Sequence, residues 1–194
     1  TPALLDDVLV DSGSRWTADQ PIPESDDDRL TILPHRSLPA GTRQEVREAF
    51  ATEASDVDAP SAAVVSSESP HDLGVDAYIL SDASGFVGHG EGLTDAIIRA
   101  KDALPADTAL VLSGVATPLN VATLVYAGVD AVDAKLAKIK GSQGKYLTGD
   151  DEAFLEDLDE LPCACAACQQ PREAFTREDC IDHNVAALRA ELRR

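Results

Sequence analysis

The sequence lacks methionine, long apolar runs and dispersed cysteines, and each absence limits what the chain can be. Without an initiating methionine, we expect the 194 residues to be a piece of a longer protein. No stretch approaches the roughly 20 apolar residues that span a bilayer, and no charged start with an apolar centre marks a secretory signal. All four cysteines fall between positions 163 and 180. A disulfide scaffold would spread them, so their clustering favours metal binding in a reducing cytoplasm.

Basic residues are scarce, at 16 against 35 acidic residues, and the formal net charge is −19. The acid is spread along the chain, so a disordered acidic segment explains only short runs such as 24–28 and 56–58. Dispersed Asp with small apolar residues suits a cytosol of very high salt, where screening weakens repulsion between like charges. We therefore predict a halophilic archaeal source. The same screening removes the usual objection to nucleic-acid binding by an acidic protein.

Short apolar runs alternate with helical patterns from residue 29 to residue 132, which predicts an α/β fold built of parallel βαβ units. Strands are expected at 30–33, 62–65, 77–80, 109–112 and 129–132. Helices are expected at 42–52, at 94–104, and from Pro118 to Gly128 with Thr117 as the N-cap. This number of strands fits either about half of a (β/α)₈ barrel or a doubly wound sheet that is cut short.

Three of the cysteines lie within six residues and form the strongest local motif. They are Cys163, Cys165 and Cys168. Thiolates this close can hold one tetrahedral ion, and Zn²⁺ prefers four sulfur or nitrogen ligands in closed structural sites. A helix predicted to start at Thr176 puts Cys180 and His183 three residues apart on one face, so either can supply the fourth ligand. Buried free thiols are the alternative. A closed site would fix the C-terminal helix to the preceding loop.

Polar residues follow the predicted strands at the edge where parallel α/β folds place their ligands. Asp133 follows the last predicted strand, where a carboxylate can act as nucleophile or base, or can cap the next turn. Gly85, Gly88 and Gly90 form a turn that resembles a phosphate or base cradle only weakly, because it does not fit the dinucleotide fingerprint. His89, in the same turn, is expected to be a solvated loop residue.

Four of the five lysines fall within eleven residues of a chain that otherwise avoids them. They are Lys135, Lys138, Lys140 and Lys145. A local basic patch in an acidic chain indicates contact with a phosphate backbone. A solvated surface loop is the alternative.

Several of these features together resemble the tRNA-guanine transglycosylases and their archaeal relatives. The zinc site of that family is a Cys-x-Cys-x₂-Cys motif followed downstream by His-Asn, which here matches His183-Asn184. The resemblance therefore assigns His183 as the fourth zinc ligand, beside the three cysteines of the motif, and leaves Cys180 as a bystander. The lead-in to the motif, at 144–148 and 158–162, also matches.

The segments 112–118 and 128–133 resemble the base pocket and the strand that ends in the family's catalytic aspartate. In that family an aspartate attacks the ribose of tRNA, guanine leaves, and a deazapurine replaces it. The resemblance puts Asp133 at the nucleophile position, with Gly85 and Gly114 as candidates for the base pocket or its backbone. It also makes the four clustered lysines candidates for tRNA contact.

The sequence departs from the archaeal transglycosylase pattern in three places. The run from Gly114 to Pro118 stands where Gly-Ala-Gly-His-Pro is expected, and residues 134–138 stand where a small or aromatic run is expected after the aspartate. The first half of the barrel, with a second catalytic aspartate and a guanine-reading aspartate, is not recognisable. These departures are more similar to the archaeosine synthase paralogues. Those proteins act on tRNA that already carries 7-cyano-7-deazaguanine and add lysine at the nitrile. Asp133 would then be a relic, on a part that serves as scaffold and tRNA-recognition surface.

The resemblance implies a tRNA-modifying transferase of archaeosine biosynthesis, located in the cytoplasm. The alternatives are a base-exchanging transglycosylase and a non-catalytic zinc-stabilised tRNA-binding module. It further implies Zn²⁺ as cofactor, free lysine or a deazapurine base as small substrate, a radical-SAM partner and a homodimer. The implied fold is a partial (β/α)₈ TIM-type barrel with a C-terminal zinc-binding subdomain. Its parts are a poorly defined segment at 1–28, the C-terminal part of the barrel at 29–150, and the zinc subdomain with the start of a helix at 151–194.

Overall fold

The computed structural model describes residues 3–4, 9–11, 29–33, 60–68 and 72–194, together with 44, 45, 48, 51, 52 and 55. Its central element is a seven-stranded sheet in which every pairing is parallel. In sheet order the strands are β1 (Ala3–Leu4), β7 (Ala131–Val132), β6 (Ala109–Leu112), β5 (Ala77–Leu80), β4 (Ser61–Val65), β3 (Arg29–Ile32) and β2 (Leu9–Asp11). From β2 to β7 the strands follow the order of the chain, and β1 lies beside β7. Among the described strands, no pairing joins β1 to β2.

The predicted parallel α/β organisation is confirmed. Strands β5 and β6 have the predicted bounds, and β5 is buried along its whole length, as expected for a parallel strand that is covered on both faces. The two edge strands, β1 and β2, were not predicted, because they are defined by pairing with a neighbouring strand and not by an apolar run. The predicted helix at 42–52 lies largely outside the described residues; positions 44, 45, 48, 51 and 52 within it are helical.

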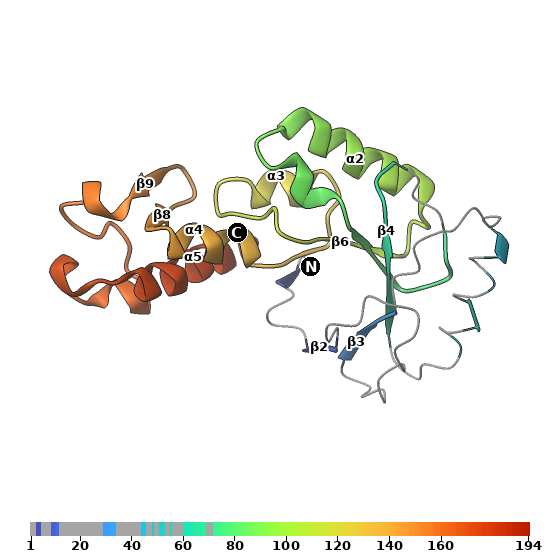
Figure 1. Ribbon diagram of the computed structural model, residues 1–194, viewed down its shortest axis with the longest axis horizontal. Coiled ribbons are helices and arrows are strands. Elements are labelled where there is room, and N and C mark those ends of the chain that lie inside the picture. The colour runs from blue at the N-terminus through green and yellow to red at the C-terminus, as the bar shows by residue number, and fades with distance from the viewer. Residues whose placement is uncertain are drawn as a thin grey trace.

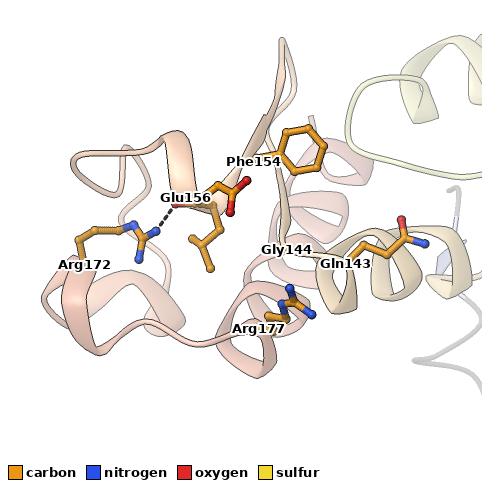
Figure 2. Close-up of a pocket in the computed structure, with 7 residues that line it drawn as sticks. Gln143, Gly144, Phe154, Glu156, Arg172 and Arg177 are labelled. Atoms are coloured by element: carbon orange, nitrogen blue, oxygen red, sulfur yellow. Dashed lines mark hydrogen bonds between the residues drawn. The ribbon is translucent and has the colours of Figure 1, made fainter.

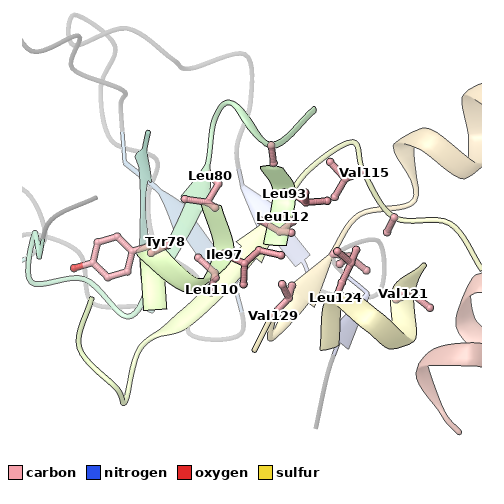
Figure 3. Packing of buried hydrophobic residues seen from close by; sticks show 14 of the residues in the cluster. Tyr78, Leu80, Leu93, Ile97, Leu110, Leu112, Val115, Val121, Leu124 and Val129 are labelled. Atoms are coloured by element: carbon pink, nitrogen blue, oxygen red, sulfur yellow. The ribbon is translucent and has the colours of Figure 1, made fainter. Parts of the chain in front are cut away.

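Two helices, α2 (Gly90–Ala103) and α3 (Val121–Tyr126), lie on one side of the sheet (Figure 1). Helix α2 buries a stripe at helical spacing, made of Leu93, Ala96, Ile97 and Ala100. Figure 3 shows Leu93 and Ile97 packed with Leu112 and Leu110 of β6. The opposite face of the sheet carries a separate cluster of mostly smaller side chains, including Ala62, Val64 and Ala77.

Both of these helices start elsewhere than the sequence predicts. Helix α2 begins at Gly90 rather than at Thr94, whose hydroxyl donates to the Gly90 carbonyl within the helix at 2.9 Å. Helix α3 begins at Val121, so Thr117 is not its N-cap. The Asn120 side chain instead accepts from the Thr117 N–H at 2.8 Å and so closes the turn that precedes the helix.

Aspartates that precede two of the strands tie neighbouring strands together. The Asp76 carboxylate accepts from the Ser61 N–H at 2.8 Å. The Asp130 carboxylate accepts from the Leu110 N–H at 2.8 Å and contacts the Lys101 ammonium at 3.2 Å. Part of the acidic excess therefore has a structural role at the amino ends of the strands.

The C-terminal part of the chain extends away from the sheet (Figure 1). Helix α4 (Lys135–Ser142) leads to an antiparallel hairpin of β8 (Lys145–Leu147) and β9 (Glu152–Phe154). The short 3₁₀ turns η3 (Leu155–Asp157), η4 (Ala166–Gln169) and η5 (Arg172–Ala174) follow, as η2 (Ala83–Phe86) follows β5. Helix α5 (Arg177–Leu192) is the last of the described elements. Its predicted start is confirmed, because Thr176 and Asp179 form a reciprocal capping box.

Helix α5 joins the C-terminal part to the sheet. Cys180, in its first half, is buried with the cysteine-rich segment, while Val185 and Leu188 belong to the main core, to which α3 and β6 also contribute. Residues 135–142 of the lysine-rich segment form helix α4 rather than a loop, and the α4 backbone lies against α5 at Gly141. A Cβ added to Gly141 would lie 2.7 Å from the Ile181 Cα, so the close approach requires glycine. Within the described ranges, no helix combines the length and apolar character that crossing a bilayer demands.

Candidate metal centre and the carboxyl edge of the sheet

The ligand atoms of Cys163, Cys165, Cys168 and His183 all lie within 4.8 Å of one another. His183 Nδ1 is 3.5 Å from Cys165 Sγ and 3.4 Å from Cys168 Sγ. With metal–sulfur bonds of about 2.3 Å and metal–nitrogen bonds of about 2.1 Å, a tetrahedral ion separates sulfur from nitrogen by about 3.6 Å. The four residues therefore fit one small tetrahedral metal ion.

Strand β8 orients the histidine. The His183 Nε2–H donates to the Leu147 carbonyl at 2.9 Å, so Nδ1 presents its lone pair to the cysteines. Asn184 accepts from the N–H of the same Leu147 at 2.9 Å and donates to the Ala137 and Lys145 carbonyls. Burial lowers the pKa of His183 although the Leu147 carbonyl opposes it, which favours the neutral imidazole that metals bind. The His-Asn pair thus binds both backbone groups of Leu147, its carbonyl through His183 and its N–H through Asn184.

Tyr146 contacts two members of the cluster. Its ring stacks on the His183 ring, with centroids 3.7 Å apart and planes inclined by 10°. Its hydroxyl lies 3.3 Å from Cys168 Sγ, and only 1% of the residue is exposed. The sequence singled out residues 144–148 only as a lead-in to the cysteines. No local pattern singled out Tyr146, because β8 is buried at both Tyr146 and Leu147 and shows no alternation.

Hydrogen bonds within the loop that carries the cysteines also hold their thiol groups in place. The Cys165 N–H donates to Cys163 Sγ at 3.4 Å, and the Cys168 N–H donates to the Cys165 carbonyl at 3.0 Å. Burial, together with the neighbouring thiols, raises the pKa of Cys168 to about 12 despite the Tyr146 hydroxyl, which lowers it. A bound cation would reverse this preference, because metals bind the thiolate.

Cys180 lies outside the cluster. It is completely buried, and its Sγ donates to the Lys145 carbonyl at 3.4 Å. Burial raises the pKa of Cys180 to about 11, so this residue is a protonated thiol at neutral pH. Of the two candidates for the fourth ligand, the structure brings His183 rather than Cys180 to the three cysteines.

Asp133 lies at the carboxyl end of β7 with 9% of its side chain exposed. Its Oδ1 accepts from the N–H of Gly114 at 2.8 Å and from that of Lys135 at 3.2 Å. Its Oδ2 accepts from the Ser113 hydroxyl at 2.6 Å and lies 3.3 Å from the Lys135 ammonium. Gly114 has a φ of +75°, the left-handed region that glycine adopts most readily. The carboxylate thereby ties the loop after β6 to the start of α4.

Asp82 repeats this arrangement after β5. It accepts from the Ser67 hydroxyl at 2.7 Å, from the Ser67 N–H at 3.1 Å and from the Ser66 hydroxyl at 3.1 Å. Burial acts to raise the pKa of Asp82, but the hydrogen bonds from Ser67 and Ser66 outweigh it and lower the pKa. Gly85 follows in η2, where an added Cβ would meet nothing within 4 Å, so no close contact requires glycine there. It lines an open surface hollow with His89.

The four clustered lysines lie on α4 and β8. Lys135 contacts Asp133, while Lys140 and Lys145 share the Glu152 carboxylate, with the Lys145 contact at 2.7 Å. Lys138 is exposed on α4. The basic patch is therefore partly neutralised by its own acidic partners. Arg172 and Arg177, which lie close to the hairpin, were not singled out from the sequence.

Comparison with known proteins gives a family match over most of the chain. The queuine tRNA-ribosyltransferase family model matches residues 38–189. Archaeosine synthase of Haloferax volcanii is 63% identical over all of this chain and 33% of its own length. Archaeosine synthase subunit alpha of Methanosarcina acetivorans is 31% identical over 95% of this chain and 33% of its own length. The chain thus spans about a third of the length of these relatives.

A second group of relatives matches a shorter part of the chain. The tRNA-guanine(15) transglycosylase of Haloferax volcanii is 33% identical over 54% of this chain and 22% of its own length. The corresponding protein of Thermococcus onnurineus is 30% identical over 53% of this chain.

Proposed function

Because the chain belongs to the queuine tRNA-ribosyltransferase family, we propose that it is part of a tRNA-modifying enzyme of archaeosine biosynthesis. One comparison carries this proposal. Of two Haloferax volcanii relatives, the archaeosine synthase matches the whole chain and the tRNA-guanine(15) transglycosylase matches about half of it. The proposed substrate is tRNA that carries 7-cyano-7-deazaguanine. We propose a cytoplasmic location, because this is where such tRNA would be modified. An amine of lysine would add to the nitrile carbon while its proton passes to the nitrile nitrogen, and no group would leave.

The described residues act in this proposal as scaffold and tRNA-recognition surface. The strands from β2 to β7 follow the chain in order, as in a (β/α)₈ barrel, with β1 as the next strand around it. Helices α2 and α3 lie on the outer face of such a barrel, and the cluster of Ala62, Val64 and Ala77 would line its interior. We assign the addition of lysine to residues outside this chain.

Zinc is the metal that the cluster fits best. Three thiolates and one imidazole at tetrahedral spacing are the ligands that structural Zn²⁺ sites use. When bound, zinc would hold the thiolates together and, with four protein ligands, would keep no open position for water or substrate. Cys163, Cys165, Cys168 and His183 would then fix the cysteine loop to α5.

Replacing Tyr146 with Phe is expected to weaken zinc binding by about 10-fold, which is the lower end of the usual effect of outer-shell partners. The change keeps the ring on His183 but removes the hydroxyl 3.3 Å from Cys168 Sγ. Competition with a chromophoric chelator measures the affinity. Tyr126→Phe is the matched control, because Tyr126 is 93% exposed. Equal affinities for the Tyr146 variant and the control would show that the hydroxyl does not support the site.

Base exchange through Asp133 is the second candidate function. Family membership favours it, but the geometry supports a structural role, because both carboxylate oxygens of Asp133 already accept hydrogen bonds. Asp82 has the same kind of partners after β5 and serves as an internal comparison.

Asp133→Asn in the full-length protein is therefore expected to leave lysine addition to tRNA within about threefold of wild type, because no reacting group is lost. The amide presents an N–H₂ group to donors, so we expect a loss of about 1–3 kcal/mol in the free energy of unfolding. Radiolabelled lysine incorporation and denaturant titration in molar KCl measure the two effects. Asp82→Asn should behave alike. A fall of a thousandfold or more in tRNA modification for Asp133→Asn alone would instead establish Asp133 as the nucleophile.

A further inference from the structure

A pocket of about 280 Å³ lies between the β8–β9 hairpin and the start of α5. Phe154, Glu156, Arg172, Arg177 and Gln143 surround its floor at Gly144. Figure 2 shows Phe154 and Arg177 on opposite sides of Gly144, with Gln143 at one end and Arg172 at the other. The pocket is distinct from the metal cluster and from the carboxyl edge of the sheet.

Phe154 presents an aromatic ring to solvent in a chain that has only four phenylalanines. It is 49% exposed, although the other described aromatics of this segment, Tyr146 and Phe175, are buried. The Lys145 ammonium lies 5.4 Å from the centroid of its ring. An exposed ring beside a cation is the pairing that binds unstacked nucleobases in single-stranded nucleic acid.

The two arginines of the pocket differ in their contacts. The Arg172 guanidinium donates to the carbonyls of Leu155 and Leu158, so it holds the η3 turn in place. Arg177 is exposed, and among the described residues its guanidinium has no hydrogen-bond or ion-pair partner. Its fork of N–H donors is therefore available to a phosphate.

Glycine keeps the floor of the pocket open. Gly144 is buried, with a φ of +77° that a side chain rarely adopts. A Cβ at this position would lie 3.7 Å from Arg177 Nε, in the space between the arginine and the hairpin. The backbone thus leaves room for a ligand beside the Arg177 guanidinium.

Among the residues that line the pocket, cations outnumber anions. They are the guanidinium groups of Arg172 and Arg177, against the single carboxylate of Glu156. In a protein with a net charge of −19 this excess among the lining residues is local. At molar salt the screening length is about 3 Å, so charge alone attracts RNA weakly. Stacking and direct hydrogen bonds do not depend on long-range attraction, and the pocket offers both.

We propose that this pocket binds one unpaired nucleotide of the tRNA, with its base stacked on Phe154 and a phosphate held by Arg177. Glu156 and Gln143 provide an acceptor and an amide for the edge of the base. This inference rests on the proposed function, since it names the surface that holds the tRNA substrate.

Affinity of the full-length protein for unmodified tRNA, measured across a range of KCl concentrations, tests the pocket. Phe154→Leu should weaken binding by about 5- to 100-fold without changing the dependence on salt, because it removes stacking alone. Phe154→Tyr keeps the ring and should bind as wild type. Arg177→Gln should reduce the slope of log affinity against log salt by about 1, and Arg177→Lys should restore it. Zinc content and thermal unfolding should match wild type in all four variants.

Two results would overturn the proposal, and they are distinguishable. If wild type modifies tRNA but Phe154→Leu and Arg177→Gln bind it with unchanged affinity and salt slope, the pocket does not hold the nucleotide and the proposed function stands. If wild-type protein neither binds nor modifies tRNA, the proposed function falls and the pocket assignment falls with it.

Discussion

Cys168→Ser is expected to abolish zinc binding and to release the cysteine loop from α5. Cys168 Sγ lies 3.4 Å from His183 Nδ1 and 3.3 Å from the Tyr146 hydroxyl, and the other three residues of the cluster already supply one ligand each. Structural zinc contributes apparent free energies of about 10–16 kcal/mol in isolated zinc-finger peptides. We expect a smaller loss here, of several kcal/mol, because Val185 and Leu188 of α5 also pack in the main core.

Metal content after dialysis against a chelator, together with hydrogen exchange of the backbone amides, measures this effect. Protection should be lost over residues 145–176 and kept over β4 to β6. Cys180→Ala is the matched control, because Cys180 is another buried thiol, 3.4 Å from a carbonyl and outside the cluster. Full metal content in the Cys168 variant, or equal metal loss in the control, would contradict the assignment of the cluster.

Asn184→Leu is expected to destabilise the protein by about 3–5 kcal/mol, which is large for a change of similar volume. Asn184 is completely buried, and its amide makes three hydrogen bonds, to Leu147, Ala137 and Lys145. Leucine fills the space but leaves the Leu147 N–H buried without a partner. Because the Leu147 carbonyl also orients His183, zinc affinity should fall as well.

Denaturant unfolding in molar KCl gives the change in stability. Asp182→Ala provides the control, since Asp182 is exposed on the same helix two residues away and its replacement should cost less than about 0.5 kcal/mol. If Asn184→Leu were as stable as this control, the side chain of Asn184 would not join α4, β8 and α5.

The parts of the fold that local patterns determine were predictable. Four apolar residues in a row defined β5 and β6, and Thr176 with Asp179 defined the start of α5. Helix α4 was not predicted, because its buried positions are the small Ala137 and Gly141, which give a weak apolar pattern. The small size of these two residues allows α5 to pack closely against α4. The sequence of α4 alone does not show this, because α5 is distant in the chain.

The candidate site, too, was predictable only where a local pattern determines it. Spacing grouped the three cysteines, but Cys180 and His183 share a helix and only the position of β8 separates their roles. It places the Leu147 carbonyl beneath the imidazole and the Lys145 carbonyl beneath the thiol. A capping role for Asp133 could be proposed from its place after a strand, but its partners come from the loop after β6, which only the folded sheet brings near. The homodimer and the radical-SAM partner stay predictions.

Transfer of labelled lysine by the full-length wild-type protein to tRNA that carries 7-cyano-7-deazaguanine distinguishes addition at the nitrile from base exchange. The label is expected to join the tRNA, and the modified base is expected to keep its bond to ribose. Release of the base, or its exchange for free deazapurine without lysine, would contradict the proposed function and would identify the protein as a base-exchanging transglycosylase.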